Sequence, residues 1–257
     1  YVINLALFGY EQQRMWESDP DVASTIGSAI FPLFIRDFAP FDARLKSIIS
    51  RLKQSKKVYA QTKKRVTKPI KLWTEMAIES CERFPPFLDI ILEEAKRRKT
   101  NKKILDDLIK AVNETKQDTA DYKEYLKNIL PKAKTEYIIG KNKFEHLIQL
   151  RELGLTSNEI LRLGEKYFKE FKIKLVKVAK QIKPNASVEE VKEIVKSNHP
   201  KDFNEALKVY RESINKARGF VIKHNVATVP KKEKLLVIET PTYLRQTTPF
   251  AAYFSPA

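Results

Sequence analysis

The chain has 257 residues, 42% of them hydrophobic, which suffices for one large folded domain or two smaller ones and excludes an intrinsically disordered protein. Its 49 lysine and arginine residues against 32 acidic residues give a formal net charge of +17. Such a charge is typical of a polyanion-binding surface, of the Lys/Glu-rich surfaces of heat-loving organisms, or of a basic half whose acidic half lies elsewhere.

The single cysteine and the N-terminal segment bear on the cellular compartment. Cys81 excludes an internal disulfide and lies on an apolar face with Trp73 and Met76, so we interpret it as a buried structural thiol. The apolar run at residues 1–8 is too short to cross a bilayer and lacks the basic start of a signal peptide. We therefore expect a cytoplasmic protein with no membrane partner.

Apolar residues recur at helical spacing through the first 150 residues. The clearest helical patterns cover residues 41–52, 72–77, 104–112, 122–129 and 144–150. Pro85 and Pro86 are expected to break or kink the second helix, and Gly154 to end the last one. The sequence lacks a fixed-period repeat, which is the main signature of a helical solenoid.

The following segment contains capping-box patterns, in which the first side chain and a carboxylate three residues later satisfy backbone amides at a helix start. They occur at Thr156/Glu159 and Ser187/Glu190, with the same spacing at Asp202/Glu205. The helix after Thr156 carries Tyr167, Phe168 and Phe171 at helical spacing, which we interpret as core residues.

The C-terminal segment differs from the helical chain before it. Residues 235–239 predict a short β-strand, and no charged residue follows Arg245. A single strand leaves a row of unpaired backbone groups, so the sequence is expected to be a fragment that stops where a sheet begins. We predict a mainly α multi-helix bundle at residues 1–230, divisible near residue 154, and the start of the β/cleft region of an absent catalytic half at residues 231–257.

Groups that could catalyse a reaction are few. His146, His199 and His224 are far apart in sequence, and none has a second ligand at the i+4 spacing of a helical zinc site. Acidic pairs such as Glu93/Glu94 are adjacent, so their side chains point to different parts of a helix surface. We predict no metal ligand and no catalytic residue in this chain.

Five segments carry a resemblance to a known family: residues 27–42, 44–48, 71–79, 144–156 and 241–253. The closing run Pro-Thr-x-x-Leu-Arg-x-x-x-Pro-Phe-Ala-Ala-Tyr is the most specific of them. The sequence resembles the prokaryotic family of unknown function DUF885 over essentially its whole length, but over only about the N-terminal half of the family's length. Members resemble helical zincin-type metallopeptidases, with an H-E-x-x-P-G-H-type zinc helix and an E-G-W glutamate located after the point where this chain ends. The resemblance thus implies zinc in a missing half, and none bound here.

The resemblance also implies a role for the C-terminal segment. A strand near the active-site helix of zincins binds extended peptide by backbone pairing. Arg245 would face a carboxylate of a peptide substrate, and Tyr243 or Tyr253 would line the cleft or donate to a developing oxyanion. Alternatively, all three residues pack between the helical and catalytic halves.

Three hypotheses follow for function. The first is the N-terminal helical portion of a zinc-dependent peptidase, which forms one wall of the substrate cleft, is inactive alone, and has the rest of its own polypeptide as partner. The second, based on the charge of +17, is a basic helical module that binds nucleic acid or another polyanion. The third is a non-catalytic scaffold that binds a partner.

Overall fold

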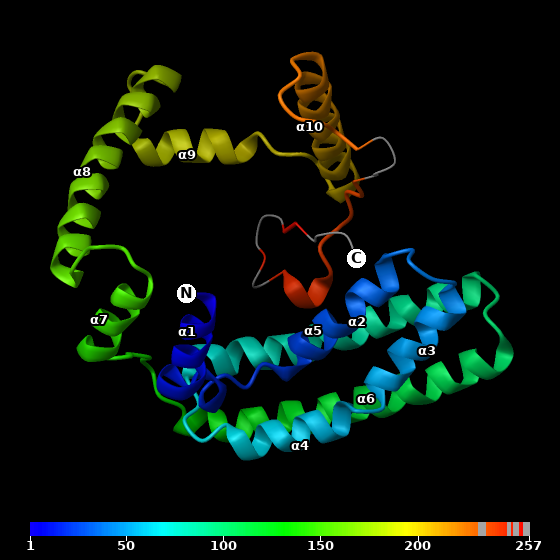
Figure 1. The fold of residues 1–257 in the computed structure, drawn as a ribbon. Coiled ribbons are helices and arrows are strands. Elements are labelled where there is room, and N and C mark those ends of the chain that lie inside the picture. Colours follow the sequence, from blue (N-terminus) through cyan, green and yellow to red (C-terminus); the bar gives the residue numbers. More distant parts are fainter. Residues whose placement is uncertain (231–234, 246–247, 249–251, 254–257) are drawn as a thin grey trace. The chain divides into compact units, whose positions relative to one another are not determined.

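The computed structural model describes residues 1–230, 235–245, 248, 252 and 253, and in these residues the chain is mainly helical (Figure 1). The chain divides into two compact units. Unit 1 contains Tyr1–Leu153 and Thr240–Ala257, and unit 2 contains Gly154–Glu239. No helix within the described residues is both long and apolar enough to span a membrane.

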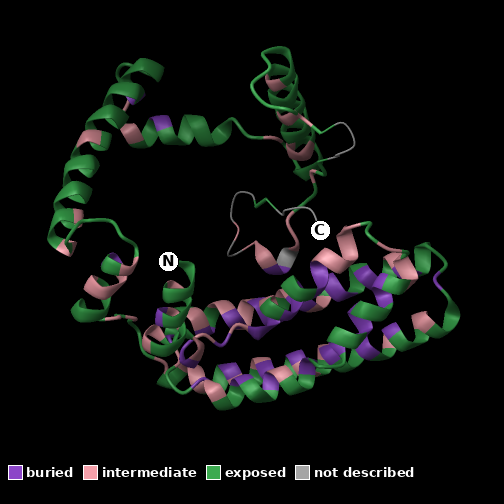
Figure 2. Ribbon diagram, viewed as in Figure 1, coloured by how far each residue is buried: buried purple, intermediate pink, exposed green. Residues whose placement is uncertain are grey.

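Unit 1 contains eleven helical elements in the part of the chain that is described. They are α1 (Val2–Leu7), a π-helical turn η1 (Phe8–Gln13), η2 (Met15–Glu17), α2 (Val22–Ile35), α3 (Phe41–Leu52), α4 (Ser55–Arg65), α5 (Lys71–Arg97), α6 (Lys102–Ile129), η3 (Leu130–Lys132) and α7 (Lys141–Leu150), with a further turn, η4 (Thr242–Leu244), after unit 2. Helix α5 packs along α6, and α2 packs against α3. In addition, α2 packs against α5, and α3 packs against α6. The core lies among these four helices (Figure 2).

Helix α5 runs through the two prolines that were expected to break or kink it. Pro85 and Pro86 remove two backbone donors, at a cost of about 3 kcal/mol for a proline inside a helix. Phe84, Phe87 and Leu88 around them are buried in the core of unit 1. Tertiary packing on this turn therefore keeps the helix continuous, so of the predicted break or kink the break is wrong.

A polar contact joins α4 and α6 and explains two differences from the sequence prediction. The patterns at 104–112 and 122–129 belong to one 28-residue helix, α6, and α4 was not predicted. The Ser55 hydroxyl donates to Asp118 at 2.7 Å, and the hydroxyls of Tyr59 and Thr119 lie 2.9 Å apart. Because polar side chains occupy this interface, the apolar periodicity is interrupted in both helices.

The predicted strand at residues 235–239 is not formed: these residues have no regular secondary structure. In the described part of the chain the β-type pairing is a single parallel bridge between Ile70 and Lys134, which belong to unit 1. A strand is formed by backbone pairing with a neighbouring strand, and the bridge in the described residues lies outside 235–239. The described residues are therefore all-α, without the expected short β segment.

Unit 2 contains α8 (Ser157–Ile182), α9 (Val188–Ser197) and α10 (Phe203–Lys223). Capping boxes form at Thr156/Glu159 and Ser187/Glu190, and the Asp202 side chain accepts from the Glu205 amide at 2.9 Å. These helix starts are confirmed. The core assignment of Tyr167, Phe168 and Phe171 is wrong, since they are 50%, 72% and 62% exposed.

Candidate functional site

Tyr243 is fully buried in unit 1, at the contact of η4 with α2 and α5. Its ring lies 5.2 Å from the Phe87 ring and 6.2 Å, edge to face, from the Phe84 ring, measured between centroids. Burial raises the pKa of the Tyr243 hydroxyl above its ordinary value, and the neighbouring Ser28 side chain offsets part of that rise. The side chain thus anchors the C-terminal turn in the helical core.

Gly27 makes this anchoring sterically possible. A Cβ at Gly27 would lie 2.6 Å from Cε2 of Tyr243, closer than such atoms approach in proteins. Sequence analysis named both residues in separate segments of the family resemblance but did not bring them together. The available signal was a glycine inside an apolar helical pattern, which often marks a close approach.

The turn that follows from Tyr243 is held by its own backbone. The Leu244 amide donates to Pro241 O at 3.0 Å, and the Thr248 amide donates to Leu244 O at 2.8 Å. Arg245 is half-buried, and its Nε donates to Thr240 O at 3.0 Å. The structure therefore brings Tyr243 and Arg245 into one turn.

Tyr253, the third predicted site residue, is 75% exposed. Phe250 and Phe254, the other aromatic residues near it in sequence, lie outside the described residues.

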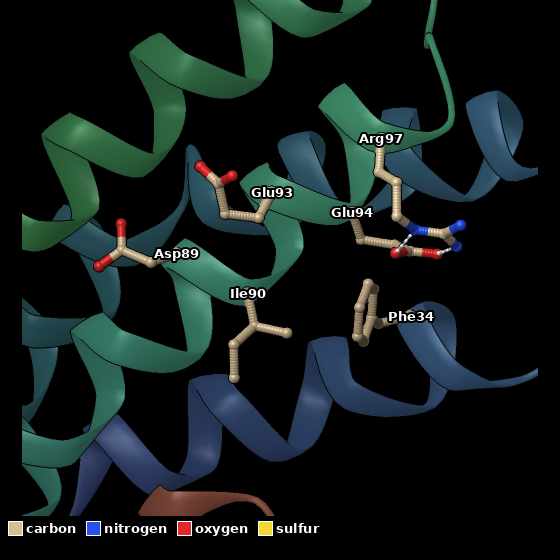
Figure 3. Close-up of a pocket in the computed structure, with 6 residues that line it drawn as sticks. All are labelled: Phe34, Asp89, Ile90, Glu93, Glu94 and Arg97. Carbon is tan, nitrogen blue, oxygen red and sulfur yellow. Dashed lines mark hydrogen bonds and ion pairs between the residues drawn. The ribbon is translucent and has the colours of Figure 1, made fainter.

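A shallow depression of about 530 Å³ lies between the C-terminal parts of α2 and α5 (Figure 3). Its lining residues are Phe34, Asp89, Ile90, Glu93, Glu94 and Arg97. The Phe34 ring also contacts Phe87 at 6.0 Å, and Phe87 in turn contacts Tyr243. One aromatic cluster therefore supports both the depression and the anchored turn.

The carboxylates of this depression have cationic partners. Glu94 accepts from Arg97 at 2.6 and 2.7 Å, and its hydrogen bonds to Arg97 and Arg98 lower its pKa to about 2. Glu93 pairs with Lys96 at 2.9 Å, and Asp89 pairs with Lys116. Because its pKa is about 2, Glu94 stays ionised and is not suited to shuttle protons at neutral pH.

Cys81 lies inside unit 1, 3% exposed. Burial raises the pKa of its thiol to about 12, and the charge of Asp21 adds to the effect. A thiol with such a pKa carries almost no thiolate at neutral pH and is a poor nucleophile. The interpretation of Cys81 as a buried structural residue is confirmed.

The histidines do not form a metal site. His146 Nδ1 lies 3.2 Å from Gln12 Oε1, His199 Nδ1 lies 2.8 Å from Pro200 O, and His224 lies against the Phe220 ring. Within the described ranges no group of three or more His, Cys, Asp or Glu side chains could hold a metal ion. The residues present here therefore do not fit a zinc centre.

In the residues that the structure describes, the fold and this site define a mainly helical protein in which the turn at Thr242–Leu244 is anchored in the core of unit 1. The chain belongs to the family described as "Bacterial protein of unknown function (DUF885)", whose model matches residues 3–257. This confirms the resemblance to DUF885 itself. No curated protein matches the sequence.

One solved structure with the same fold is a lipoprotein candidate of unknown function from Shewanella oneidensis, with a TM-score of 0.57 and 16% sequence identity. The match covers 93% of this chain and 47% of that chain. The chain therefore spans about half the length of the structure that it resembles.

Proposed function

We propose that this chain is the N-terminal helical portion of a zinc-dependent peptidase and forms one wall of its substrate cleft. The observation that supports the proposal most is the family match over residues 3–257 together with a structural match to only 47% of the longer neighbour. Since the described residues do not fit a zinc centre, the proposal places the metal and its ligands in a portion outside these 257 residues.

Within this proposal the three predicted site residues have different roles. Tyr243 is fully buried, so we assign it the role of anchoring the turn against α2 and α5. The anchored turn positions Arg245, whose planar guanidinium suits a substrate carboxylate. Tyr253 is exposed and is the residue proposed to line the cleft or to donate to the developing oxyanion.

The test uses the full-length parent protein. We expect it to bind zinc and to hydrolyse peptides in a reaction that a chelator abolishes. Arg245→Gln should raise KM for peptides with a free C-terminal carboxylate and leave KM for amidated peptides unchanged. Arg211→Gln is the matched control, because Arg211 also donates to a backbone carbonyl, Val237 O at 3.0 Å, but in unit 2. A zinc-free parent without peptidase activity contradicts the proposal.

The second candidate function is binding to nucleic acid or another polyanion. The observation that favours it is the net charge of +17 together with seven Lys and Arg residues against three Glu residues on α8. Counterion release predicts that such binding weakens steeply as salt rises, which a band-shift series measures. Absence of salt-dependent binding near physiological ionic strength excludes this candidate and leaves the peptidase or the non-catalytic scaffold.

A further inference from the structure

An apolar stripe runs along α8, the 26-residue first helix of unit 2. At 3.6 residues per turn one face of the helix carries the following apolar residues: Ile160, Tyr167, Phe168, Phe171, Leu175, Val178 and Ile182. Except for Ile160, which is half-buried, each is between 45% and 72% exposed. We name this set the α8 stripe.

The other helices of unit 2 leave most of the α8 stripe uncovered. Helix α8 packs against α9, and the buried residues at that contact are Ala179 on α8 and Val191 on α9. Phe203 and Tyr210 of α10 are themselves 54% and 50% exposed. Most large amphipathic helices bury such a face, because tertiary packing supplies most of a helix's stability. A large exposed apolar patch with a polar border marks an interaction surface.

We propose that the α8 stripe is the docking surface for the second half of the DUF885 polypeptide, the portion that would carry the catalytic centre. This inference rests on the proposed function, since it takes this chain as the N-terminal portion of a longer protein. It adds the location of the contact between the two portions.

The structural neighbour supports this occupant. Only about 18 residues of this chain are not covered by the match, which is fewer than the 26 residues of α8 or the 21 residues of α10. Parts of both helices therefore have counterparts in a fold whose own chain is about twice as long. The matched parts of these helices therefore belong to a longer polypeptide in that protein, and we take the portion outside the match as the occupant of the α8 stripe.

Charge defines the chemistry of the docking partner. The seven cations of α8 outnumber its three glutamates, and Lys172 and Lys174 lie at the two borders of the stripe. A complementary surface is an apolar patch bordered by carboxylates, because unlike charges at the rim favour docking and like charges oppose it. An acidic second half would also balance the basic charge of this chain.

The experiment compares this 257-residue chain with the full-length parent by hydroxyl-radical footprinting and mass spectrometry. Phe168 and Phe171 should be oxidised rapidly in the chain alone and several-fold more slowly in the parent. Ile173 is the internal control: it is 70% exposed on the opposite face of α8 and should react equally in both. Equal oxidation of Phe168 and Phe171 in both proteins overturns the proposal.

A pair of variants tests the energetics of the same contact. Phe171→Glu should lower the Tm of the parent, whereas Ile173→Glu, at a residue of similar exposure on the other face, should leave it unchanged. Neither substitution should change the Tm of the shorter chain. If Phe171→Glu prevents folding of the parent, footprinting of the unmutated protein still tests whether the α8 stripe is covered.

The alternative occupants give distinct results. Phe171-dependent dimerisation of the shorter chain in sedimentation overturns the proposal in favour of a second copy. Phe171-dependent binding of the parent to vesicles of phosphatidylglycerol overturns it in favour of a lipid surface. Its failure is distinguishable from that of the proposed function, because zinc content and peptidase activity of the parent are measured independently of α8 protection.

Discussion

Replacing Gly27 with alanine should destabilise unit 1, although the same change stabilises most helix interiors. Glycine inside a helix costs about 0.5–1 kcal/mol relative to alanine, and Gly27 lies within α2. However, the new methyl group would lie 2.6, 2.8 and 2.9 Å from three ring carbons of Tyr243. The two effects therefore oppose each other at this position.

The surroundings of Tyr243 decide which effect is larger. The ring is fully buried and in contact with Phe84 and Phe87, so moving it away from a methyl group at Gly27 would disturb both contacts. Overpacking of a well-packed core costs about 1–3 kcal/mol, which exceeds the helix-propensity gain over most of that range. We expect the free energy of unfolding to fall by about 0.5–2 kcal/mol. The loss would be largest if the new methyl group displaced the Tyr243 ring from the core, because removing a large buried aromatic side chain costs about 3–5 kcal/mol.

A double-mutant cycle with Tyr243→Ala isolates the contact. Without the ring, Gly27→Ala should become stabilising by about 0.5–1 kcal/mol, so the sign of its effect reverses. Gly164→Ala is the control, because a Cβ at Gly164 in α8 meets nothing within 4 Å and should show only the propensity gain. Urea unfolding followed by circular dichroism, with hydrogen exchange of α2 and α5, measures the effects. Equal stabilisation by Gly27→Ala with and without the Tyr243 ring would refute the reasoning.

Three further predictions concern groups buried in unit 1. Arg44 is 3% exposed and donates to Ala39 O, Phe34 O and Arg36 O at 2.7–2.9 Å, so Arg44→Met should lower the free energy of unfolding by about 3–5 kcal/mol. Its ion-pair partner Asp37 has a 91% exposed side chain, and Asp37→Asn should cost less than about 1 kcal/mol in urea unfolding; equal losses would contradict this assignment. Burial raises the pKa of Asp21 above its ordinary value. The stability that Asp21 contributes is therefore full below the ordinary carboxyl pKa and is lost as pH rises through the raised value. Asp21→Asn should flatten that part of the curve of unfolding free energy against pH. An unchanged curve would show that Asp21 does not titrate in this way. With its pKa raised to about 12, the Cys81 thiol should react with Ellman's reagent only after denaturant is added, and rapid labelling of the native protein would contradict its burial.

The sequence predicted some helices with an apolar buried face and missed others: α2 was not predicted although its buried residues include Ile26 and Ile30, and α4, whose buried face is polar, was also missed. Residues 41–52 were predicted and form α3, whose inner face includes Leu45, Ile48 and Leu52. Helix α4 was missed because its buried residues are Ser55, Tyr59 and Thr62. The hydrogen bonds of Ser55 and Tyr59 to α6 replace the hydrophobic contacts that periodicity detects, and a single sequence does not show which hydroxyls will find partners.

The candidate site was predictable as residues but not as a contact. The segment carrying Tyr243 and Arg245 was identified from its pattern, yet Tyr243 was expected to line a cleft or to pack between two halves. In the structure its ring lies in the chain's own core, in contact with α2, which is more than two hundred residues earlier in the sequence. No residue near Tyr243 in the sequence indicates where its ring packs. The structure shows that the missing side chain of Gly27 leaves room for the ring against α2.

Unit 2 shows how helix formation and helix burial depend on different information. The caps at Thr156, Ser187 and Asp202 were read from four-residue patterns and are confirmed, because capping depends on atoms within one turn. The stripe of Phe168 and Phe171 was equally visible, but a stripe states only that a helix needs an apolar neighbour and does not say which. In unit 1 the neighbours of each stripe are other helices of the unit, and together they bury one hydrophobic core. In unit 2 the same type of pattern is exposed, and the proposed docking of a partner surface would bury it.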